Sequence, residues 1–265
     1  MAIGVTIVGA TGWVGRSLVG AVAAAPDLRL AGAVARGAAG QDVGSATGGD
    51  ALGVTIVATL AEALRAPGEV VVDYTTPEAV KAHTLAAIGS GRSVVIGTSG
   101  LTGDDYAELD EAARRAGVGV IAAGNFSITA TLMQRFALMA ARYVADVEVL
   151  DYASAAKPDV PSGTARELAE KLGEIRQDAT SRPLASLHGP KEARGAQIGR
   201  TQVHCVRMPS FVLSCEAVFG ADDERLVIRH DAGSSASPYV AGTLLAIRKV
   251  RDVPGLRRGL DSILE

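Results

Sequence analysis

Three glycines near the start of the chain have a spacing that suits phosphate binding. Gly9, Gly12 and Gly15 form a G-x-x-G-x-x-G pattern between a β-branched run at 3–8 and a helical pattern at 14–25. Glycines let the backbone approach a pyrophosphate, and the helix N-terminus behind them supplies N–H donors and the positive end of a dipole. The pattern therefore predicts dinucleotide binding, with a glycine turn that binds no ligand as the alternative.

The end of the second predicted strand indicates which dinucleotide binds. Folds that prefer NAD usually carry Asp or Glu at this point, where the carboxylate binds the ribose 2′-OH. Here the strand at 28–34 is followed by Ala35 and Arg36, without a carboxylate. Arg36 can pair with a 2′-phosphate through charge-assisted hydrogen bonds, and the alternative is a solvated surface arginine. We therefore predict that NADPH is the preferred cofactor, with NADH as the second candidate.

A second candidate site lies in the segment KPDVPSGTA at 157–165. Ser162, Gly163 and Thr164 would present N–H and hydroxyl donors at the start of a predicted helix, which suits a carboxylate. Lys157 lies just upstream and would add a positive charge or donate a proton. The alternative is an ordinary helix start with an exposed lysine.

Short strands and helices alternate through the first half of the chain, as in a doubly wound fold. The predicted strands of this half lie at 3–8, 28–34, 54–58, 70–72, 93–96 and 117–122, with helices between them. After residue 125 the pattern changes to a long helix at 128–144, a strand at 146–153, and strand-like runs at 201–207, 212–219 and 224–230 without intervening helices. These runs predict a mostly antiparallel sheet, followed by a closing helix at 240–249.

The predicted fold class is α/β, with two domains. An N-terminal Rossmann dinucleotide-binding domain would comprise 1–125 and 236–265, and an α+β mixed-sheet domain would comprise 126–235. The closing helix would return the chain to the first domain.

Composition and charge exclude several other classes of protein. The net charge is -3 and the chain has 4 Phe, 5 Tyr and 1 Trp, so neither a basic surface nor stacking platforms favour nucleic acid. The apolar run at 18–25 is far shorter than the ~20 residues that span a bilayer, and no basic segment precedes the first apolar run. Two cysteines make no disulfide framework, and the four histidines show no ligand spacing, so no metal site is expected. We predict a cytoplasmic protein without membrane or nucleic-acid partners.

Several segments together resemble the dihydrodipicolinate reductase (4-hydroxy-tetrahydrodipicolinate reductase) family of the lysine pathway, particularly its actinobacterial members. The resemblance covers essentially the full length of the chain, and the Pro-Ser-Gly-Thr-Ala motif is its most specific part. The similar segments lie at 9–16, 71–80, 95–100, 124–133, 157–165, 193–196, 203–210, 226–232 and 240–260.

The resemblance implies a Rossmann domain followed by a substrate and tetramerisation domain in a homotetramer. It further implies the use of NADH or NADPH to reduce a cyclic imine or enamine that carries carboxylates. The residues that it implies for cofactor binding are Gly9, Gly12, Trp13, Val14 and Gly15 at the phosphates, Gly97, Thr98 and Gly100 at the nicotinamide, Asp73 and Thr75 in the adjoining cleft, and Asn125 and Phe126 at the hinge near the ring. The residues that it implies for the substrate carboxylate are Lys157, Ser162, Gly163 and Thr164.

The chain departs from the family pattern just before Lys157. Members carry a His-His pair there, and the first histidine is assigned as the proton donor, whereas this chain has Ala153 and Ser154. Alanine has no proton to donate, and a serine hydroxyl is a poor general acid near neutral pH. The remaining candidate catalytic residues are Lys157, Tyr152 and Ser154, with water as a further proton source.

Three interpretations follow from this departure. The first, which we favour, is a reductase of the same family that acts on a different and less acidic imine, because the cofactor motifs and the Pro-Ser-Gly-Thr-Ala segment are intact. The second is a true lysine-pathway enzyme that works without the usual acid. The third is a non-catalytic nucleotide-binding relative.

Overall fold

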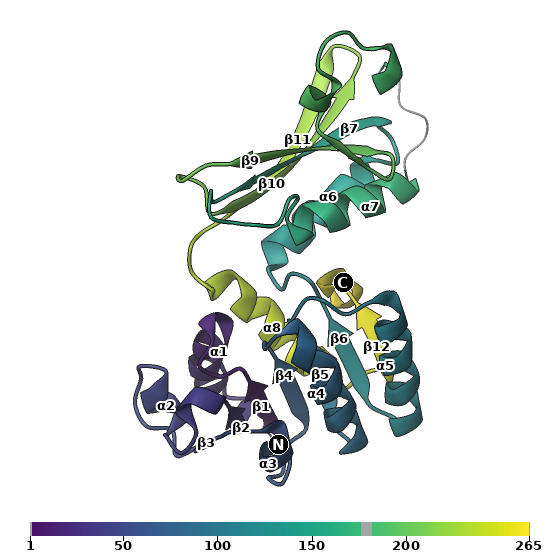
Figure 1. The fold of residues 1–265 in the computed structure, drawn as a ribbon. Helices are drawn as coiled ribbons and strands as arrows, with labels where there is room; N and C mark the ends of the chain where they lie inside the picture. Colours follow the sequence, from purple (N-terminus) through teal and green to yellow (C-terminus); the bar gives the residue numbers. More distant parts are fainter. Residues whose placement is uncertain (1, 176–181, 265) are drawn as a thin grey trace. The chain divides into compact units, whose positions relative to one another are not determined.

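The computed structural model describes residues 2–175 and 182–264, and the chain divides into two compact units (Figure 1). Unit 1 comprises Met1–Ile128 and Ala236–Glu265, and unit 2 comprises Thr129–Ser235. Each unit contains its own sheet and its own apolar core.

Unit 1 is built on a parallel sheet with the strand order β12-β6-β5-β4-β1-β2-β3. The strands are β1 (Ile3–Val8), β2 (Leu28–Val34), β3 (Ile56–Val57), β4 (Val70–Asp73), β5 (Ser93–Ile96), β6 (Gly119–Ala122) and β12 (Gly255–Arg258). The order runs outward from β1 through β2 and β3 on one side, and through β4, β5 and β6 on the other. The switch in direction falls between β1 and β4, and open α/β sheets bind ligands at the carboxyl ends of the strands beside this point.

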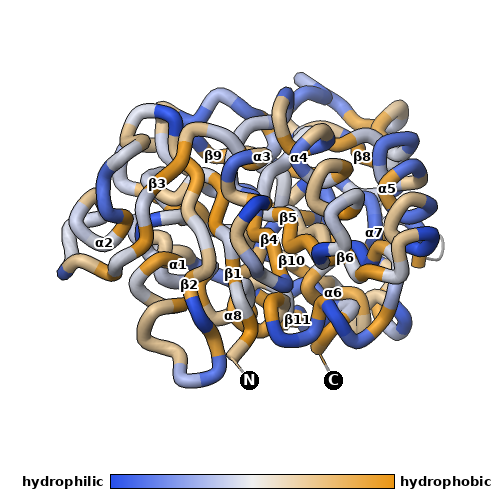
Figure 2. The backbone as a smooth tube through the Cα atoms, turned by 90° about the horizontal axis from the view of Figure 1, so that it is seen from below, coloured by the Kyte–Doolittle hydropathy of each residue, from blue (hydrophilic) through white to orange (hydrophobic). Residues whose placement is uncertain are grey.

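Helices cover both faces of this sheet. They are α1 (Trp13–Ala24), α2 (Val43–Ala46), α3 (Leu60–Ala63), α4 (Pro77–Gly89), α5 (Gly103–Ala116) and α8 (Ser237–Lys249), with 3₁₀ turns η1 (Arg36–Ala38) and η4 (Leu260–Ile263). One apolar core lies under α1 and α8, and the other lies under α3, α4 and α5. Because both faces are covered, β4 and β5 are buried along their whole length and are strongly hydrophobic (Figure 2).

Unit 2 contains a mixed sheet with the strand order β11-β10-β7-β9-β8. The strands are β7 (Asp146–Ala153), β8 (Ala196–Ile198), β9 (Thr201–Arg207), β10 (Leu213–Ala221) and β11 (Glu224–Ala232). The helices are α6 (Ile128–Ala140) and α7 (Gly163–Ile175), with 3₁₀ turns η2 (Leu184–Ser186) and η3 (Lys191–Arg194). Along β7, buried and half-buried residues alternate, because one face packs against α6 and α7. We call the opposite face, which carries Glu148, Leu150 and Tyr152, the outer face.

The structure confirms the predicted fold class and corrects several elements. The second sheet is mixed and mostly antiparallel, as predicted, and its parallel pair is formed by β7 and β9, which are joined by a crossover that contains α7. Helix α2 was not predicted individually; it forms because the Asp42 carboxylate accepts the Gly44 and Ser45 N–H groups and starts a helical turn. Strands β8 and β12 were not predicted, since both are short edge strands with few apolar residues.

Candidate functional site

The turn after β1 is tight and depends on glycine at two positions. Gly9 has a φ of 85°, and its N–H donates to the Val34 carbonyl at the end of β2. A β-carbon at Gly9 would lie 2.4 Å from the Tyr74 carbonyl oxygen, and one at Gly15 would lie 2.1 Å from the Gly9 carbonyl oxygen. A side chain at Gly9 would therefore push the turn away from the backbone that follows β4, and a side chain at Gly15 would push α1 away from the turn.

The N-terminus of α1 behind this turn has no side-chain cap. Its N-cap is Gly12, and the first turn holds no acidic residue. The positive end of the helix dipole is therefore not compensated locally, which favours an anion at this end. Trp13 and Val14 occupy the first turn, and the Trp13 side chain is 59% exposed.

Arg36 begins the 3₁₀ turn η1 directly after β2, and its side chain is exposed. Among the described residues, no ion-pair partner of Arg36 is found, and the neighbouring Ala35 is buried. The position that would carry a ribose-binding carboxylate thus holds an alanine.

Asp73, at the end of β4, organises the loops around it. Its side chain is fully buried and accepts the Thr75 N–H at 3.0 Å, the Thr75 hydroxyl at 2.6 Å and the Thr98 hydroxyl at 2.9 Å. The second oxygen lies 2.8 Å from Nδ1 of His83 on α4. Asp73 therefore fixes Thr75 and Thr98, which the resemblance places in the cofactor cleft.

An aromatic pocket of about 170 Å³ lies within unit 1. Its lining residues are Trp13, Val14, Tyr74, Gly97, Gly124, Asn125, Phe126 and Tyr239. The Trp13 and Tyr239 rings meet edge to face at 5.6 Å, and the Tyr74 and Phe126 rings are 6.1 Å apart. A β-carbon at Gly97 would lie 2.1 Å from the Tyr74 ring, so the ring packs directly on the backbone. The pocket brings together five residues predicted from the sequence, namely Trp13, Val14, Gly97, Asn125 and Phe126.

Tyr74, Gly124 and Tyr239 were not predicted as site residues. Tyr74 directly follows the carboxyl end of β4, and this position is a signal that sequence reasoning could have used. The Tyr74 hydroxyl lies 2.8 Å from the Thr243 hydroxyl, which donates to the Tyr239 carbonyl, so the phenol is the donor of the pair. Burial raises the pKa of Tyr74, and the phenol therefore stays neutral. Gly100, with a φ of 109°, packs on Pro77 and does not line the pocket.

In unit 2, the start of α7 is tied to β7 by a buried carboxylate. Asp151 is fully buried and accepts the Ser162 N–H at 2.8 Å and the Ser162 hydroxyl at 2.7 Å. The Ser162 oxygen in turn accepts the Ala165 N–H at 3.4 Å. The donors of Ser162, predicted for the substrate carboxylate, are thus engaged by Asp151. Gly163 is exposed in the first turn of α7.

Lys157 lies in the turn between β7 and α7. Its ammonium group is 2.9 Å from the Asp159 carboxylate, and its side chain is 32% exposed. The Lys157 N–H donates to the Ser154 carbonyl, and the Ser154 hydroxyl accepts the Ala156 N–H at 3.3 Å. Ala153 is fully buried in β7. Lys157 is thus the cation in this turn.

Tyr152 points to the outer face, opposite its neighbours Asp151 and Ala153. Its ring packs on Phe211 at 5.1 Å, and the Arg229 guanidinium lies 4.8 Å from the ring centre. Desolvation raises the pKa of the Tyr152 hydroxyl, which makes it a weaker acid. The structure does not bring Tyr152 to the face that carries Asp151 and Ser162.

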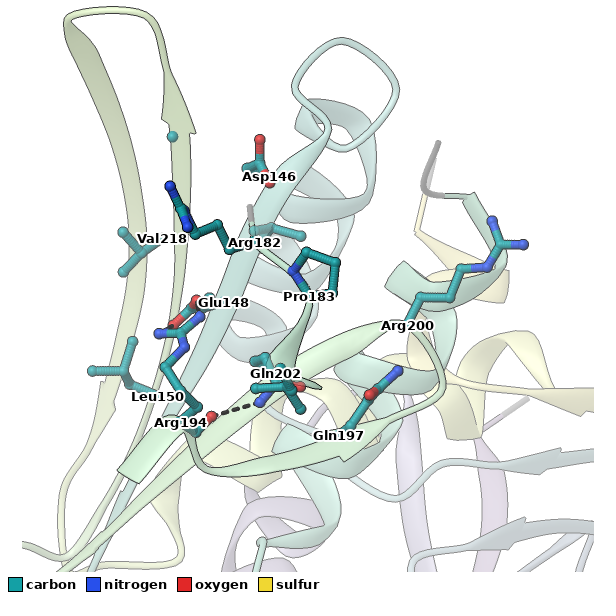
Figure 3. A pocket seen from close by; sticks show the side chains of 13 residues that line it. Asp146, Glu148, Leu150, Arg182, Pro183, Arg194, Gln197, Arg200, Gln202 and Val218 are labelled. Carbon is teal, nitrogen blue, oxygen red and sulfur yellow. Dashed lines mark hydrogen bonds and ion pairs between the residues drawn. The ribbon is translucent and has the colours of Figure 1, made fainter. Parts of the chain in front are cut away.

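A larger cavity of about 640 Å³ opens on the outer face (Figure 3). Its polar lining includes Arg182, Arg200 and Arg194, and Arg194 pairs with Glu148 and accepts the Gln202 amide N–H at its carbonyl. None of the sequence-predicted site residues lines this cavity.

Metal-binding clusters and membrane-spanning helices are two other features that would bear on function. Within residues 2–175 and 182–264, no group of three or more His, Cys, Asp or Glu side chains is arranged to hold a metal ion. In the same residues, no helix has the length and apolar character needed to cross a membrane.

A doubly wound sheet with an uncapped helix behind a glycine turn and an aromatic pocket beside it is the framework of an NAD(P)H-dependent oxidoreductase. Residues 3–126 match the family model of the dihydrodipicolinate reductase N-terminus, and residues 129–264 match that of its C-terminus. The chain belongs to the dihydrodipicolinate reductase family, so the resemblance seen in the sequence is confirmed.

Individual relatives agree with this assignment. The chain is 39% identical over 271 residues to the 4-hydroxy-tetrahydrodipicolinate reductase of Synechococcus elongatus, covering 99% of this chain and 98% of that one. It is 35% identical to the enzyme of the same name from Geobacillus kaustophilus, with full coverage of both chains. Dipicolinate-bound dihydrodipicolinate reductase from Paenisporosarcina sp. TG-14 has a TM-score of 0.86 and 29% identity, with full coverage of both chains. The protein is an oxidoreductase, so the non-catalytic interpretation is set aside.

Proposed function

We propose that the protein is an NADPH-preferring reductase that transfers hydride to the C=N group of a small imine or enamine bearing a carboxylate. We further propose that its substrate has diverged from the lysine-pathway intermediate of its named relatives. Support for hydride transfer comes from the family and from the aromatic pocket of unit 1. Support for the divergence comes from unit 2.

The observation that carries the divergence is the absence of any imidazole at the end of β7. Ala153 is fully buried, and the Ser154 backbone N–H donates to the Val212 carbonyl at 3.3 Å, which holds this turn against β10. The Ser154 hydroxyl is itself a hydrogen-bond acceptor for the turn. Neither residue can replace the histidine that protonates the substrate in the family, and general acid catalysis contributes about 10²–10⁴-fold to rate.

The residues of each unit have distinct roles in this proposal. When bound, the reduced nicotinamide supplies the hydride. Trp13, Tyr74 and Phe126 enclose a planar ring and exclude water from it. In unit 2, the backbone of Gly163 and Thr164 at the start of α7 orients the substrate carboxylate. The Lys157 ammonium group donates the proton that balances hydride addition, and Asp159 holds that group in place. We assign this role to Lys157 because Tyr152 points to the outer face and the Ser154 hydroxyl already accepts the Ala156 N–H.

The preference for NADPH rests on Ala35 and Arg36. A buried alanine offers no acceptor to the ribose 2′-OH, and the exposed Arg36 guanidinium offers a partner for a 2′-phosphate. NADH remains the second cofactor in this proposal.

A genuine lysine-pathway reductase is the second candidate function. Relatives that are 34–39% identical over nearly the whole chain carry the name 4-hydroxy-tetrahydrodipicolinate reductase, which favours this reading. Such an enzyme would rely on Lys157 or water for the proton and would turn over slowly.

We also propose a homotetramer located in the cytoplasm. Leu150 is half-buried and Val227 is 51% exposed on the outer face of the sheet, which gives this face apolar area for packing against other copies.

A substrate screen tests the proposed function. Purified protein is mixed with NADPH and a panel of cyclic and acyclic imino acids that includes the lysine-pathway intermediate, and NADPH absorbance is followed. We expect the best turnover with an imine other than that intermediate. Robust turnover of the intermediate itself would restore the second candidate.

A further inference from the structure

Both ends of the 157–163 loop are connected to one buried carboxylate. At one end, Asp151 accepts two hydrogen bonds from Ser162, the residue that starts α7. At the other end, Arg207 on β9 donates to Asp151 at 2.7 Å and, from the same nitrogen, to the Asp159 carbonyl at 2.8 Å. Asp159 in turn pairs with Lys157 through its side chain. The position of Lys157 relative to Gly163 is therefore set through Asp151.

The burial of this cluster makes it a firm anchor. The Asp151 side chain is fully buried, and the Arg207 side chain is only 15% exposed. Arg207 also donates to the Val206 and Asp151 carbonyls, so its guanidinium is held against the sheet. Charge-assisted hydrogen bonds in a region shielded from water are strong and directional.

The charges of the cluster suit an anion site. An unpaired carboxylate next to the N-terminus of α7 would repel a substrate carboxylate that binds there. Arg207 compensates the negative charge of Asp151, so this carboxylate does not cancel the positive end of the α7 dipole that faces an external anion.

We propose that Asp151 is a positioning residue, which acts through Ser162 and Arg207 to hold the α7 N-terminus and Lys157 in the arrangement that binds the substrate carboxylate. This inference rests on the carboxylate site of the proposed function and extends it to a residue that itself touches neither substrate nor cofactor. It explains why the Ser162 donors face inward to Asp151, although the sequence predicts them for the substrate.

The test compares Asp151→Asn with the unaltered protein, using dipicolinate as a probe of the carboxylate site. Isothermal titration calorimetry gives the dipicolinate Kd, fluorescence of Trp13 gives the NADPH Kd, and thermal unfolding gives Tm. The asparagine amide presents donors toward Ser162 and Arg207, so the loop loses its anchor. We expect the dipicolinate Kd to rise about tenfold, as is usual when a group that orients a ligand-binding residue is lost, with an unchanged NADPH Kd.

Asp231→Asn is the matched control. Asp231 also accepts a serine hydroxyl, from Ser214 at 2.6 Å, and pairs with an arginine, Arg229, in the same sheet. It lies on β11 and has no hydrogen bond to the 157–163 loop among the described residues. Its replacement should leave the dipicolinate Kd unchanged.

Ser162→Ala tests the positioning role of Asp151 if Asp151→Asn does not fold. This variant keeps the Asp151–Arg207 pair and the Ser162 N–H bond. It removes the hydroxyl bond to Asp151 and the long 3.4 Å bond that the hydroxyl accepts from the Ala165 N–H, so we expect a dipicolinate Kd about fivefold higher, close to the loss of one good hydrogen bond. A variant with a lowered Tm and an unchanged dipicolinate Kd would overturn the positioning role while leaving the proposed function intact. Failure of the unaltered protein to bind dipicolinate would instead reject the carboxylate site, and the positioning role with it.

Discussion

Arg36→Ala should weaken NADPH binding selectively and leave NADH binding nearly unchanged. Arg36 is exposed at the end of β2, and it has no ion-pair partner among the described residues that would compete with a 2′-phosphate. A hydrogen bond to a charged group contributes about 1.5–3 kcal/mol, and exposure to water and salt places Arg36 at the low end of that range. A loss of about 1.4 kcal/mol corresponds to a tenfold higher Kd for NADPH.

The chain offers a direct assay for this prediction. Trp13 is the only tryptophan, and it lines the aromatic pocket of unit 1. Its fluorescence should therefore be quenched when a reduced dinucleotide binds, and titrations with NADPH and NADH give the two Kd values separately. Arg115→Ala is the control, because Arg115 is also exposed and pairs only with Glu111 one helical turn away.

Salt adds a second criterion. Because the contact is between exposed charges, the NADPH advantage should shrink as ionic strength rises. Equal Kd values for the two dinucleotides, or tighter binding of NADH, would refute the cofactor preference. An equal rise in the Kd of both dinucleotides would show that Arg36 contacts a part of the molecule that NADPH and NADH share.

Three further predictions concern catalysis and stability. Lys157→Ala should lower turnover with the best substrate by about 10²-fold or more while the NADPH Kd stays unchanged, because it removes the proposed proton donor; unchanged steady-state turnover would show that Lys157 has no part in the reaction. The double change Ala153→His and Ser154→His should raise turnover of the lysine-pathway intermediate modestly, since residues that act as a unit contribute non-additively; the divergence is rejected if the unmodified protein already turns it over fast. As pH rises above about 10, where tyrosine ionises in the unfolded chain, the free energy of unfolding should fall less for Tyr74→Phe than for the unaltered protein. The raised pKa of Tyr74 means that its contribution is fully present below that pH and is lost as pH rises, which denaturant unfolding at several pH values measures.

The parts of the site that sequence reasoning found are those with local signals. Gly9 is required by its own φ of 85°, and Gly15 by its approach to the Gly9 carbonyl; the sequence shows both the turn and its flanking strand and helix. Phe126 and Gly97 were reached through the family resemblance, and the pocket contains both.

The parts that sequence reasoning missed depend on contacts between distant residues. Ser162 donates its hydrogen bonds inward to the Asp151 carboxylate, which lies eleven residues earlier on another element, β7. The hydrogen bond from the Thr98 hydroxyl to Asp73 joins residues that follow two different strands, β5 and β4, and no local pattern marks it. Tyr239 enters the pocket from α8, far along the chain from Trp13, and no local pattern marks it.

The division of unit 1 into two stretches of chain has a consequence for synthesis on the ribosome. The first stretch, Met1–Ile128, emerges early, but the core under α1 lacks Ala246, Ile247 and Val250 until α8 emerges. The aromatic pocket likewise has no Tyr239 until then. Unit 1 therefore stays incompletely packed while unit 2 is translated, and its core and its aromatic pocket can be completed only when the segment Ala236–Glu265 has been added.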